Sequence, residues 1–344
     1  MTTIALPATA LQIDHRVASV VRDGLSSRPK RLPPWLFYDE AGSRLFDEIT
    51  ERPEYYVTRT ERAIFAAHAE AMIARAAEPD WNDLDLDKLG LDKLVRLSIA
   101  ELGAGSADKT RLLLAAAVAR QGTVIYEPVD VSASALQAAK KRIEREIAGV
   151  RVAPRVMDYT HGLRLEHAVA GERRLVLYIG SSIGNFEPSE AARLLRMIRA
   201  GLSAGDGLLL GVDLVKDEAT LLAAYDDVAG VTAAFNLNLL TRLNRELGAD
   251  FYLESFEHRA IWNASESRIE MHLESRIAQT VRLGGIGGMD FQVEFAAGES
   301  IHTENSYKYR PGQAEDLLRA GGFKLAQRWS DPNEWFAVHL ATAG

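Results

Sequence analysis

The sequence predicts an α/β protein whose main domain is a parallel sheet flanked by helices and whose second domain is assembled from separate stretches of chain. From Val95 onward, strand-like and helix-like segments alternate, which is typical of a parallel sheet. Between about residues 216 and 304 the pattern changes to a long helical stretch followed by two alternating, strand-like runs, which indicates an inserted subdomain. The tail returns to a helix and two strands, so the main domain is discontinuous in sequence.

The composition is that of an ordinary globular protein. The 344 residues are 47% apolar and 26% charged, which is enough chain for about two domains. The absence of cysteine excludes disulfides and thiolate metal ligands, and it fits a reducing, cytoplasmic setting. A net charge of -8 offers no field to hold a phosphate backbone, so nucleic acid is not an expected partner.

No membrane association is expected from the sequence. The longest uncharged apolar run, Leu112 to Ala119, is well short of the roughly 20 residues that a spanning helix needs. The amino terminus lacks the cationic start and apolar core of a secretion signal.

The elements before the sheet are an irregular segment and one helix. The first sixty residues hold several prolines and many aromatic residues without sustained helical periodicity, and we interpret them as a lid or accessory segment. Residues 61–77 place apolar side chains three and four apart, which predicts a helix. The near-repeat LDLDKLGLDKL at residues 84–94 is too brief for a solenoid and is expected to be a surface insertion.

The alternating region predicts five strands with helices between them. Strands are expected over 95–102, 123–131, 151–159, 174–186 and 205–215, and helices over 109–121, 132–148 and 188–202. In the insertion we expect a helix over 224–247 and strand-like runs over 267–283 and 289–303. The tail predicts a helix over 310–323 and strands over 324–330 and 334–343.

The strongest local motif is ELGAGS, which lies where the first strand ends and a helix begins. Gly103 and Gly105 allow the backbone to approach a ligand closely at the carboxyl edge of the sheet. A dinucleotide fingerprint would need a third glycine where this chain has Asp108, and there is no phosphate-binding P-loop motif. The loop therefore favours S-adenosylmethionine over NAD or a nucleoside triphosphate.

Four further residues are placed to complete a nucleoside site. Asp130 ends the second strand, where a carboxylate can accept hydrogen bonds from ribose hydroxyls. Asp158 and Tyr159 close the third strand, where a carboxylate and an aromatic face suit an adenine, and Lys109 opens the first helix at the same edge. Each residue also has an ordinary interpretation: Asp130 as a helix cap, Asp158 as a loop residue and Lys109 as a solvated cation.

Asn185, in the segment GSSIGNF after the fourth strand, is a candidate substrate ligand. Its amide can orient an amine or a carboxylate without placing a competing charge beside the reacting nitrogen. From propensity alone, an ordinary turn residue beside Gly184 is an equal alternative.

The ordered blocks WLFYDEAGSRLFDEITERPEYYVTRTE, ELGAGSADKTR, GSSIGNF, GVDLVKD, AYDDVAGVTAAFN and IHTENSYKYRP resemble the histidine Nα-methyltransferases of ergothioneine biosynthesis over nearly the whole chain. The resemblance implies a Rossmann-type class I methyltransferase domain, expected over residues 60–215 plus 309–344. It also implies a second, substrate-binding α/β domain made from the N-terminal segment and the insertion, expected over residues 1–59 plus 216–308, with the active site in the cleft between the two.

The resemblance also implies roles for individual residues. It assigns to the methyl donor Gly103, Lys109, Asp130, Asp158 and Tyr159. It assigns to the amino and carboxylate ends of the substrate, and so to catalysis, Tyr55, Asn185 and Tyr225. It aims at the imidazole ring Glu304 and Ser306, with Met271 as the apolar wall beside the ring.

Physical chemistry supports the imidazole assignment without deciding it. A carboxylate and a hydroxyl two residues apart on a strand point to the same face, so Glu304 and Ser306 can address both ring nitrogens. Without the resemblance, the better interpretation is an amphipathic strand with both residues on its wet face. Tyr38 and Phe46 are either core residues or pocket walls whose π faces hold the quaternary ammonium of the product.

The function implied is S-adenosylmethionine-dependent methylation of the α-amine of L-histidine, three times, to give hercynine. The alternatives are an N-methyltransferase for another amino acid or small amine, and a catalytically silent protein that binds the nucleoside. The eight histidines show no ligand spacing such as H-E-x-x-H, so no metal is expected. We expect a monomer, because neither an exposed apolar stripe nor a heptad pattern is evident.

Overall fold

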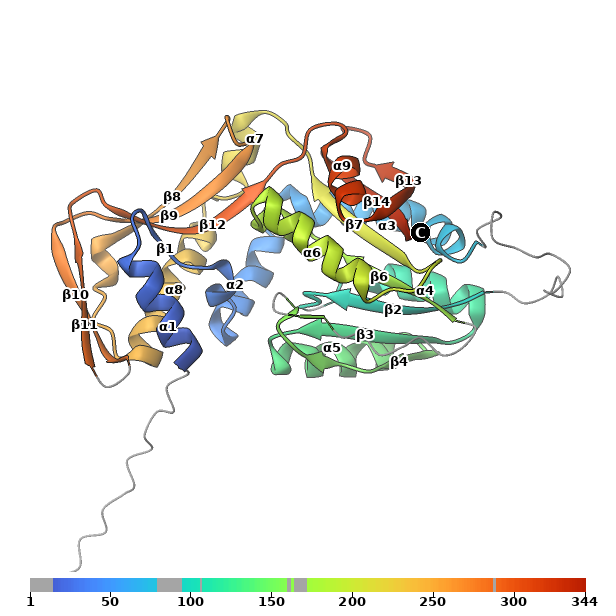
Figure 1. Ribbon diagram of the computed structural model, residues 1–344, viewed down its shortest axis with the longest axis horizontal. Coiled ribbons are helices and arrows are strands. Elements are labelled where there is room, and N and C mark those ends of the chain that lie inside the picture. Colours follow the sequence, from blue (N-terminus) through green and yellow to red (C-terminus); the bar gives the residue numbers. More distant parts are fainter. Residues whose placement is uncertain (1–14, 79–94, 106, 160–161, 164–171, 287–288) are drawn as a thin grey trace, which may run out of the picture. The chain divides into compact units, whose positions relative to one another are not determined.

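The computed structural model describes residues 15–78, 95–105, 107–159, 162–163, 172–286 and 289–344, which form two compact units (Figure 1). Unit 1 contains the described residues up to Phe46, together with Asp226–Ile261 and Glu270–Glu304. Unit 2 contains the described parts of Asp47–Tyr225, with Trp262–Ile269 and Asn305–Gly344. The expected surface insertion at 84–94 lies outside the described residues. Within the described ranges, no helix has both the length and the apolar character needed to cross a membrane.

Unit 2 is built on one large sheet. Its strands are β2 Arg96–Leu102, β3 Val124–Asp130, β4 Val150–Val152, β5 Arg155–Val156, β6 Glu172–Tyr178, β7 Gly207–Asp213, β13 Phe323–Ser330 and β14 Phe336–Ala343. They follow the order β13-β14-β7-β6-β2-β3-β4, with β5 also paired to β3. The strands from β7 to β4 are parallel to one another, whereas β14 is antiparallel to both β7 and β13.

This strand order identifies the fold of unit 2. With β5 set aside and the other strands renumbered along the chain, the sheet reads 3-2-1-4-5-7-6 from β4 to β13. The order reverses between β2 and β6, which is where a doubly wound sheet binds its ligand at the carboxyl ends of the strands. The predicted fold class, a Rossmann-type class I methyltransferase domain, is therefore confirmed.

Helices cover the sheet of unit 2 and bury its apolar strands. They are α3 Tyr56–Ala76, α4 Thr110–Gln121, α5 Ala133–Glu146, α6 Pro188–Ala200 and α9 Gln313–Ala320. The short helix α7 Glu218–Ala223 follows β7 along the chain. Helix α3 packs beside α4, and α6 packs beside α9. Leu195 and Ile198 of α6 are completely buried in one core with Leu208 and Leu210 of β7. Helix α6 begins at Pro188, as predicted, because Glu187 and Glu190 cap its first turn reciprocally.

Two of the predicted strands in unit 2 are shorter than expected. The segment predicted as one strand over 151–159 holds only the short strands β4 and β5, because Pro154 between them has no N–H to donate to a ladder. The strand predicted over 174–186 ends at Tyr178. The chain then turns through Ser181, whose φ of 58° is left-handed, into the 3-10 helix η3 Ser182–Asn185.

Unit 1 holds helices that the sequence analysis missed. The first sixty residues were expected to lack sustained helices, yet they contain α1 His15–Ser26, η1 Pro34–Phe37 and α2 Glu40–Thr50. In α1 the residues Val17, Val21 and Leu25 repeat every four positions and are all buried. The prolines lie between these helices or at their starts, where they do not interrupt the helical hydrogen bonds. The prediction of an irregular segment was therefore wrong.

The described part of the insertion contains two α-helices, α7 and α8, and five strands. Helix α8 Val231–Leu247 begins seven residues later than predicted, because Gly230 is left-handed and Asp227 accepts hydrogen bonds from the N–H groups of Val231 and Thr232. The first predicted run contains β9 Arg268–Ser275 and most of β10 Gln279–Ile286, and the second contains β11 Met289–Phe295 and the start of β12 Ser300–Tyr307. Before them lie η4 Leu253–Ser255 and the strand β8 Phe256–Asn263, which the sequence did not predict. Strand β1 Lys30–Arg31 completes a sheet ordered β1-β12-β9-β8, and β10 pairs with β11 as a separate antiparallel hairpin.

Candidate active site

The glycine-rich loop after β2 adopts the conformation that its glycines predict. Gly103 has a φ of 69° and Gly105 a φ of 49°, both in the left-handed region that favours glycine. A Cβ atom on Gly103 would lie 3.3 Å from the hydroxyl of Tyr159, so these two residues, both predicted to bind the methyl donor, are neighbours. A Cβ atom on Gly105 would meet nothing within 4 Å, so open space borders the loop at the carboxyl end of the sheet.

Asp130 holds this loop to the end of β3. Its Oδ2 atom accepts the N–H of Gly105 at 3.0 Å, and its Oδ1 atom accepts the N–H of Ser132 at 2.9 Å. The cap of α5 is Ser132, whose hydroxyl accepts the N–H of Ala135, so the interpretation of Asp130 as that helix's cap is wrong. The carboxylate is instead fixed beside the glycine loop, where a ribose-binding group is expected.

Lys109 is not the solvated cation of its ordinary interpretation. Its ammonium forms an ion pair with Glu61 of α3, a side chain that is completely buried. Glu61 also accepts the N–H of Gly180, at 2.9 and 3.0 Å from its two oxygens, just after β6. The sequence analysis missed Glu61, which reads as one more charged residue at the start of an amphipathic helix. The pair anchors Lys109 at the edge that also carries Gly103.

The pair Asp158 and Tyr159 follows β5, close to the expected place. The ring of Tyr159 meets that of Tyr178 edge to face, with 6.0 Å between their centroids. Burial, the largest influence, raises the pKa of Tyr159 to about 12, so its hydroxyl stays neutral. Asp158 is half-buried beside it. The structure thus brings to the ends of adjacent strands four residues that were predicted to bind the methyl donor: Gly103, Asp130, Asp158 and Tyr159.

Asn185 ends η3 and is half-buried. The preceding residue, Gly184, is packed so tightly that a Cβ atom there would lie 2.8 Å from the carbonyl oxygen of Tyr307. This contact fixes the turn that carries Asn185 against the end of β12.

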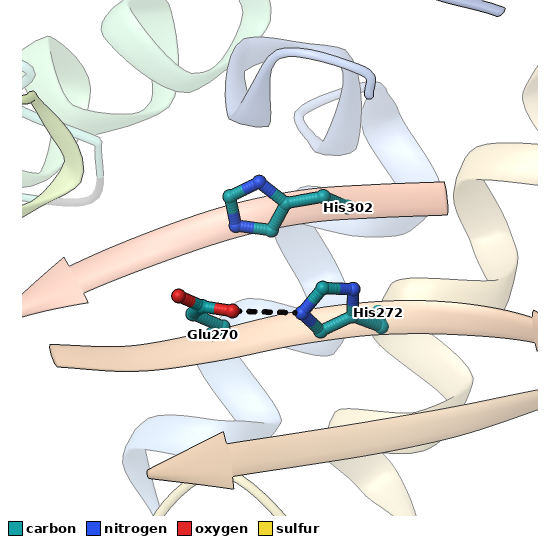
Figure 2. A group of neighbouring side chains, drawn as sticks. All are labelled: Glu270, His272 and His302. Atoms are coloured by element: carbon teal, nitrogen blue, oxygen red, sulfur yellow. Dashed lines mark hydrogen bonds and ion pairs between the residues drawn. The ribbon is translucent and has the colours of Figure 1, made fainter. Parts of the chain in front are cut away.

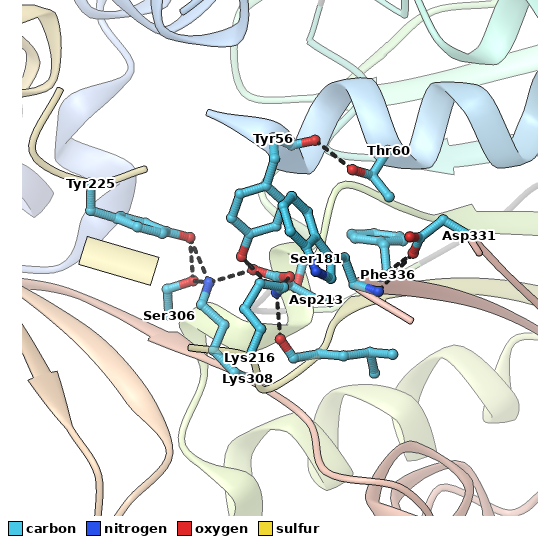
Figure 3. Close-up of polar contacts among 12 residues, drawn as sticks. Tyr56, Thr60, Ser181, Asp213, Lys216, Tyr225, Ser306, Lys308, Asp331 and Phe336 are labelled. Carbon is cyan, nitrogen blue, oxygen red and sulfur yellow. Dashed lines mark hydrogen bonds and ion pairs between the residues drawn. The ribbon is translucent and has the colours of Figure 1, made fainter. Parts of the chain in front are cut away.

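A buried ion pair beside β7 supports two of the candidate substrate ligands (Figure 3). The Nζ atom of Lys308 lies 2.9 Å from Oδ2 of Asp213, and both side chains are completely buried. Lys308 also donates to the hydroxyl of Tyr225 and to that of Ser306, at 2.8 Å each. The two hydroxyls share a hydrogen bond of 2.7 Å. All three N–H groups of the ammonium therefore have partners, and two of them are predicted site residues.

Asp213 joins this cluster to α3. Tyr56 donates its hydroxyl to Oδ2 of Asp213 at 2.7 Å, and Lys216 donates to Oδ1 at 2.6 Å. Burial opposes the charge of Asp213, but the ammonium groups of Lys308 and Lys216 hold its pKa below the usual value. Burial also raises the pKa of Tyr56 far above its usual value, with the charge of Asp213 adding to the effect. The carboxylate of Asp331 also acts on Lys216, so two carboxylates and two cations balance in this region.

The sequence analysis assigned no role to Asp213, Lys216, Lys308 or Tyr56, although all four lie in the blocks that carry the family resemblance. The available signal was a charged residue at the end of an apolar strand, since β7 reads GLLLGVD and is buried throughout. Such a charge is rarely buried without a partner.

Tyr55 lies beside Tyr225. Their rings meet edge to face with 6.2 Å between centroids, and both residues are buried. Within unit 2, the structure therefore brings together Tyr55, Tyr225 and Ser306, three of the residues predicted to bind substrate.

Four further predicted substrate ligands, Tyr38, Phe46, Met271 and Glu304, belong to unit 1. Tyr38 and Phe46 pack against Phe235 of α8, with ring centroids 5.8 and 6.0 Å away, and both are half-buried. Met271 is 2% exposed on β9 and Glu304 is half-buried on β12. A pocket that combines these residues with Tyr55, Asn185 and Tyr225 stays a prediction.

Comparisons with known proteins match the chain to a histidine-specific methyltransferase family and to relatives that include histidine N-alpha-methyltransferases and N-methyltransferases of other names. A family model described as a histidine-specific methyltransferase, dependent on S-adenosylmethionine, matches residues 17–343. The histidine N-alpha-methyltransferase of Mycolicibacterium smegmatis is 44% identical over 322 residues, which is 93% of each chain. The enzyme of the same name from Mycobacterium tuberculosis is 42% identical, also over 93% of each chain. Ergothioneine biosynthesis protein 1 of Schizosaccharomyces pombe is 27% identical over 91% of this chain and 39% of its own.

Proposed function

Because the chain belongs to the family of histidine-specific, S-adenosylmethionine-dependent methyltransferases, we propose that it methylates the α-amino nitrogen of L-histidine three times to give hercynine. The identity to two histidine N-alpha-methyltransferases over 93% of the chain is the observation that carries this proposal. The third relative supports a place for the reaction in ergothioneine biosynthesis.

The site residues fit S-adenosylmethionine, the co-substrate that supplies the methyl group. Gly103 leaves open the space that a Cβ atom would fill, and Asp130 is held beside it by the N–H of Gly105. We assign the ribose hydroxyls to Asp130, the adenine to Asp158 and Tyr159, and the methionyl carboxylate to Lys109. The ion pair with Glu61 keeps the ammonium of Lys109 in place for this contact.

The chemistry asks little of the protein beyond alignment. A neutral amine attacks the methyl carbon in line with the departing sulfur, so positioning of the nitrogen is the main contribution of the chain. Tyr55, Asn185 and Tyr225 are assigned to the α-amine and carboxylate of histidine. The amine must lose a proton before each transfer so that its lone pair is free to attack.

The hydrogen bonds of the Tyr225 and Ser306 hydroxyls determine which donors and acceptors the pair can still offer a ligand. The two groups carry two protons, and one of them lies in the hydrogen bond that joins them. Lys308 donates to both oxygens, so the oxygen that accepts the shared proton has no lone pair left and directs its own proton outward. The other oxygen keeps one lone pair. The pair therefore offers a ligand one donor and one acceptor.

Histidine selects one of the two possible directions. If Tyr225 donates to Ser306, then Ser306 donates to the unprotonated ring nitrogen and the Tyr225 oxygen accepts a hydrogen bond from an N–H of the α-amine. Glu304 then accepts the N–H of the other ring nitrogen. In this arrangement Lys308 is a positioning residue: by donating to both oxygens it leaves the hydroxyl pair one donor and one acceptor, without touching the substrate.

Replacement of the carboxylate tests the substrate assignment. Glu304→Ala should raise the Michaelis constant for histidine far more than that for S-adenosylmethionine, because it removes one imidazole contact. Asn305→Ala is the matched control, since Asn305 is the next residue on β12 and its amide donates to Glu187. Steady-state kinetics with each substrate varied in turn give both constants. Equal changes in the two constants for Glu304→Ala would reject the role of Glu304.

The nearest alternative is an N-methyltransferase for another amino acid or small amine. A few side chains suffice to change the specificity of such a pocket. Met271, Glu304 and Ser306 support histidine over this alternative, because a carboxylate and a hydroxyl match the two nitrogens of an imidazole. An indole, with its single N–H, would leave one of the two groups unpaired, and a phenyl ring would leave both unpaired.

A further inference from the structure

A group of three potential metal ligands lies on two neighbouring strands of unit 1 (Figure 2). Glu270 and His272 are two residues apart on β9, so their side chains lie on the same face, and His302 comes from β12 beside it. The imidazole rings of His272 and His302 stack with 4.9 Å between centroids and 26° between their planes. Nε2 of His272 lies 3.1 Å from Oε2 of Glu270.

We propose that Glu270, His272 and His302 form a binding site for a divalent transition metal, with zinc as the best fit. Each residue offers one ligand atom, and these atoms lie within 4.8 Å of one another. Two imidazole nitrogens and one carboxylate oxygen are a donor set that zinc takes with bonds of about 2.0 to 2.2 Å. Three protein ligands leave the fourth tetrahedral position open to water.

The geometry needs only a small adjustment to close around an ion. Ligand atoms at tetrahedral zinc are about 3.3 Å apart, given the bond lengths above, and His272 and Glu270 already meet this distance. Only the His302 ring therefore has to move closer to the ligand atoms of Glu270 and His272. All three residues are half-buried, so the ion and its water can reach them from solvent.

A purely structural role is the competing explanation for the same contacts. A carboxylate beside an imidazole, with a second imidazole stacked on it, also stabilises two adjacent strands without a metal. The two explanations differ in one respect: a structural pair holds no ion, and its stability does not depend on added zinc.

Metal binding at His302 would also reach the proposed substrate site. Nε2 of His302 lies 3.0 Å from the main-chain oxygen of Glu304, to which a ring N–H can donate. Coordination through Nε2 replaces this hydrogen bond and alters β12 next to Glu304. We therefore expect zinc to raise the Michaelis constant for histidine. This consequence rests on the proposed function, whereas metal binding itself does not.

The expectation of no metal, drawn from the sequence, considered only ligand spacings within a single motif. Here the spacing is E-x-H on one strand, with a third ligand thirty residues further along the chain. Only the pairing of β9 with β12 brings them together.

Calorimetric titration of the tag-free chain with zinc chloride, in the absence of histidine, tests the site. We expect one zinc ion per chain, and we expect His272→Gln and His302→Gln each to weaken binding by more than about tenfold, the loss caused by removing even a second-shell partner. His68→Gln, on α3 in unit 2, is the matched control and should bind as the unmodified chain does.

Equal zinc affinity in the unmodified chain and in both variants, or no binding to the unmodified chain, would overturn the proposal. Glu270→Gln keeps the shape of the side chain and serves as a further variant if a histidine replacement fails to fold. A tetrahedral cobalt(II) absorption spectrum that His302→Gln abolishes would support the ligand set independently. Kinetics at buffered zinc test the link to Glu304: an unchanged Michaelis constant for histidine with zinc bound would overturn that link alone.

Discussion

The buried ammonium of Lys308 defines the site at the scale of single residues. Its three N–H groups donate to Asp213, Tyr225 and Ser306, and all three contacts are buried. Hydrogen bonds to a buried charge are among the stronger ones in proteins, at about 1.5 to 3 kcal/mol each. The single donor and single acceptor that the Tyr225–Ser306 pair offers a ligand therefore depend on this one side chain.

Removal of this ammonium should weaken histidine recognition. Lys308→Met keeps the length of the side chain but frees both hydroxyls to reorient, so we expect kcat/KM for histidine to fall about 10- to 100-fold while the Michaelis constant for S-adenosylmethionine changes little. Lys324→Met, at an exposed position on β13, is the matched control.

The same variant also leaves Asp213 with one cation fewer, which should cost about 3 kcal/mol of unfolding free energy. Urea unfolding measures this loss separately, so kinetics are compared where the variant is folded. A uniform loss of affinity for both substrates would show that Lys308 acts only on the stability of the fold.

Single residues differ in how far the sequence reveals them. Gly103 and Asp130 could be placed because their positions at the ends of strands follow from the alternation of strands and helices. Lys308 and Asp213 could not, because their pairing joins β7 to the chain after β12, and no local pattern reports such a contact. Glu61 was hidden for the same reason, since its partners Lys109 and Gly180 lie in two other loops.

At the scale of elements, the loop after β2 is the part most sensitive to a small change. Gly103→Ala places a methyl group in a left-handed backbone and 3.3 Å from the Tyr159 hydroxyl. We expect it to raise the Michaelis constant for S-adenosylmethionine at least about tenfold, since the loop must approach the donor closely, and to change that for histidine less.

Gly298→Ala controls for the backbone cost of the first substitution. Gly298 also has a positive φ, 81°, but a Cβ atom there would meet nothing within 4 Å. Both variants should lose about 1 kcal/mol of stability from the unfavourable φ. If both substitutions also raise the Michaelis constant for S-adenosylmethionine by the same factor, the loop does not contact the methyl donor.

Elements with a strong apolar periodicity were predicted well. Elements whose ends are determined by prolines, glycines or capping residues were not. The helix α6 and the strands β2, β3, β7, β13 and β14 follow their patterns closely. Helices α1 and α2 were missed because prolines between them masked two short amphipathic stretches. The predicted start of α8 was wrong because the carboxylate of Asp227 and the left-handed Gly230 determine it, and neither contributes to apolar periodicity.

At the scale of the whole molecule, Glu101 links stability to pH. This carboxyl is completely buried at the end of β2 and accepts hydroxyl hydrogen bonds from Thr110 and Tyr126. Burial, the largest influence, raises its pKa from 4.5 to about 7. As pH rises, the Glu101 carboxyl therefore loses its proton at a lower pH in the unfolded chain than in the folded chain. The contribution of Glu101 to stability falls between about pH 4.5 and pH 7, and it is constant above pH 7.

Glu101→Gln removes this dependence while keeping an oxygen that can accept both hydroxyls. Relative to the unmodified chain, the variant should gain about 3 kcal/mol of stability between pH 4.5 and 8. Glu266→Gln, at an exposed position, should gain nothing. Urea unfolding across this pH range gives the difference, and a constant difference for Glu101→Gln would mean that Glu101 titrates normally.

The account of the whole molecule depends on the identity of the methyl acceptor. The strand order of unit 2 and the family membership define a methyltransferase, and the hydroxyl pair held by Lys308 supports a substrate that needs one donor and one acceptor. Both features bear on the same question, which is whether an imidazole is what the site selects.

Mass spectrometry of the purified chain incubated with S-adenosylmethionine and an equimolar mixture of the standard amino acids answers it most directly. The account predicts that histidine alone gains three methyl groups, with three molecules of S-adenosylhomocysteine released for each hercynine formed. Methylation of a different amino acid would contradict the roles of Met271, Glu304 and Ser306, and an absence of any methylated product would contradict the proposed activity itself.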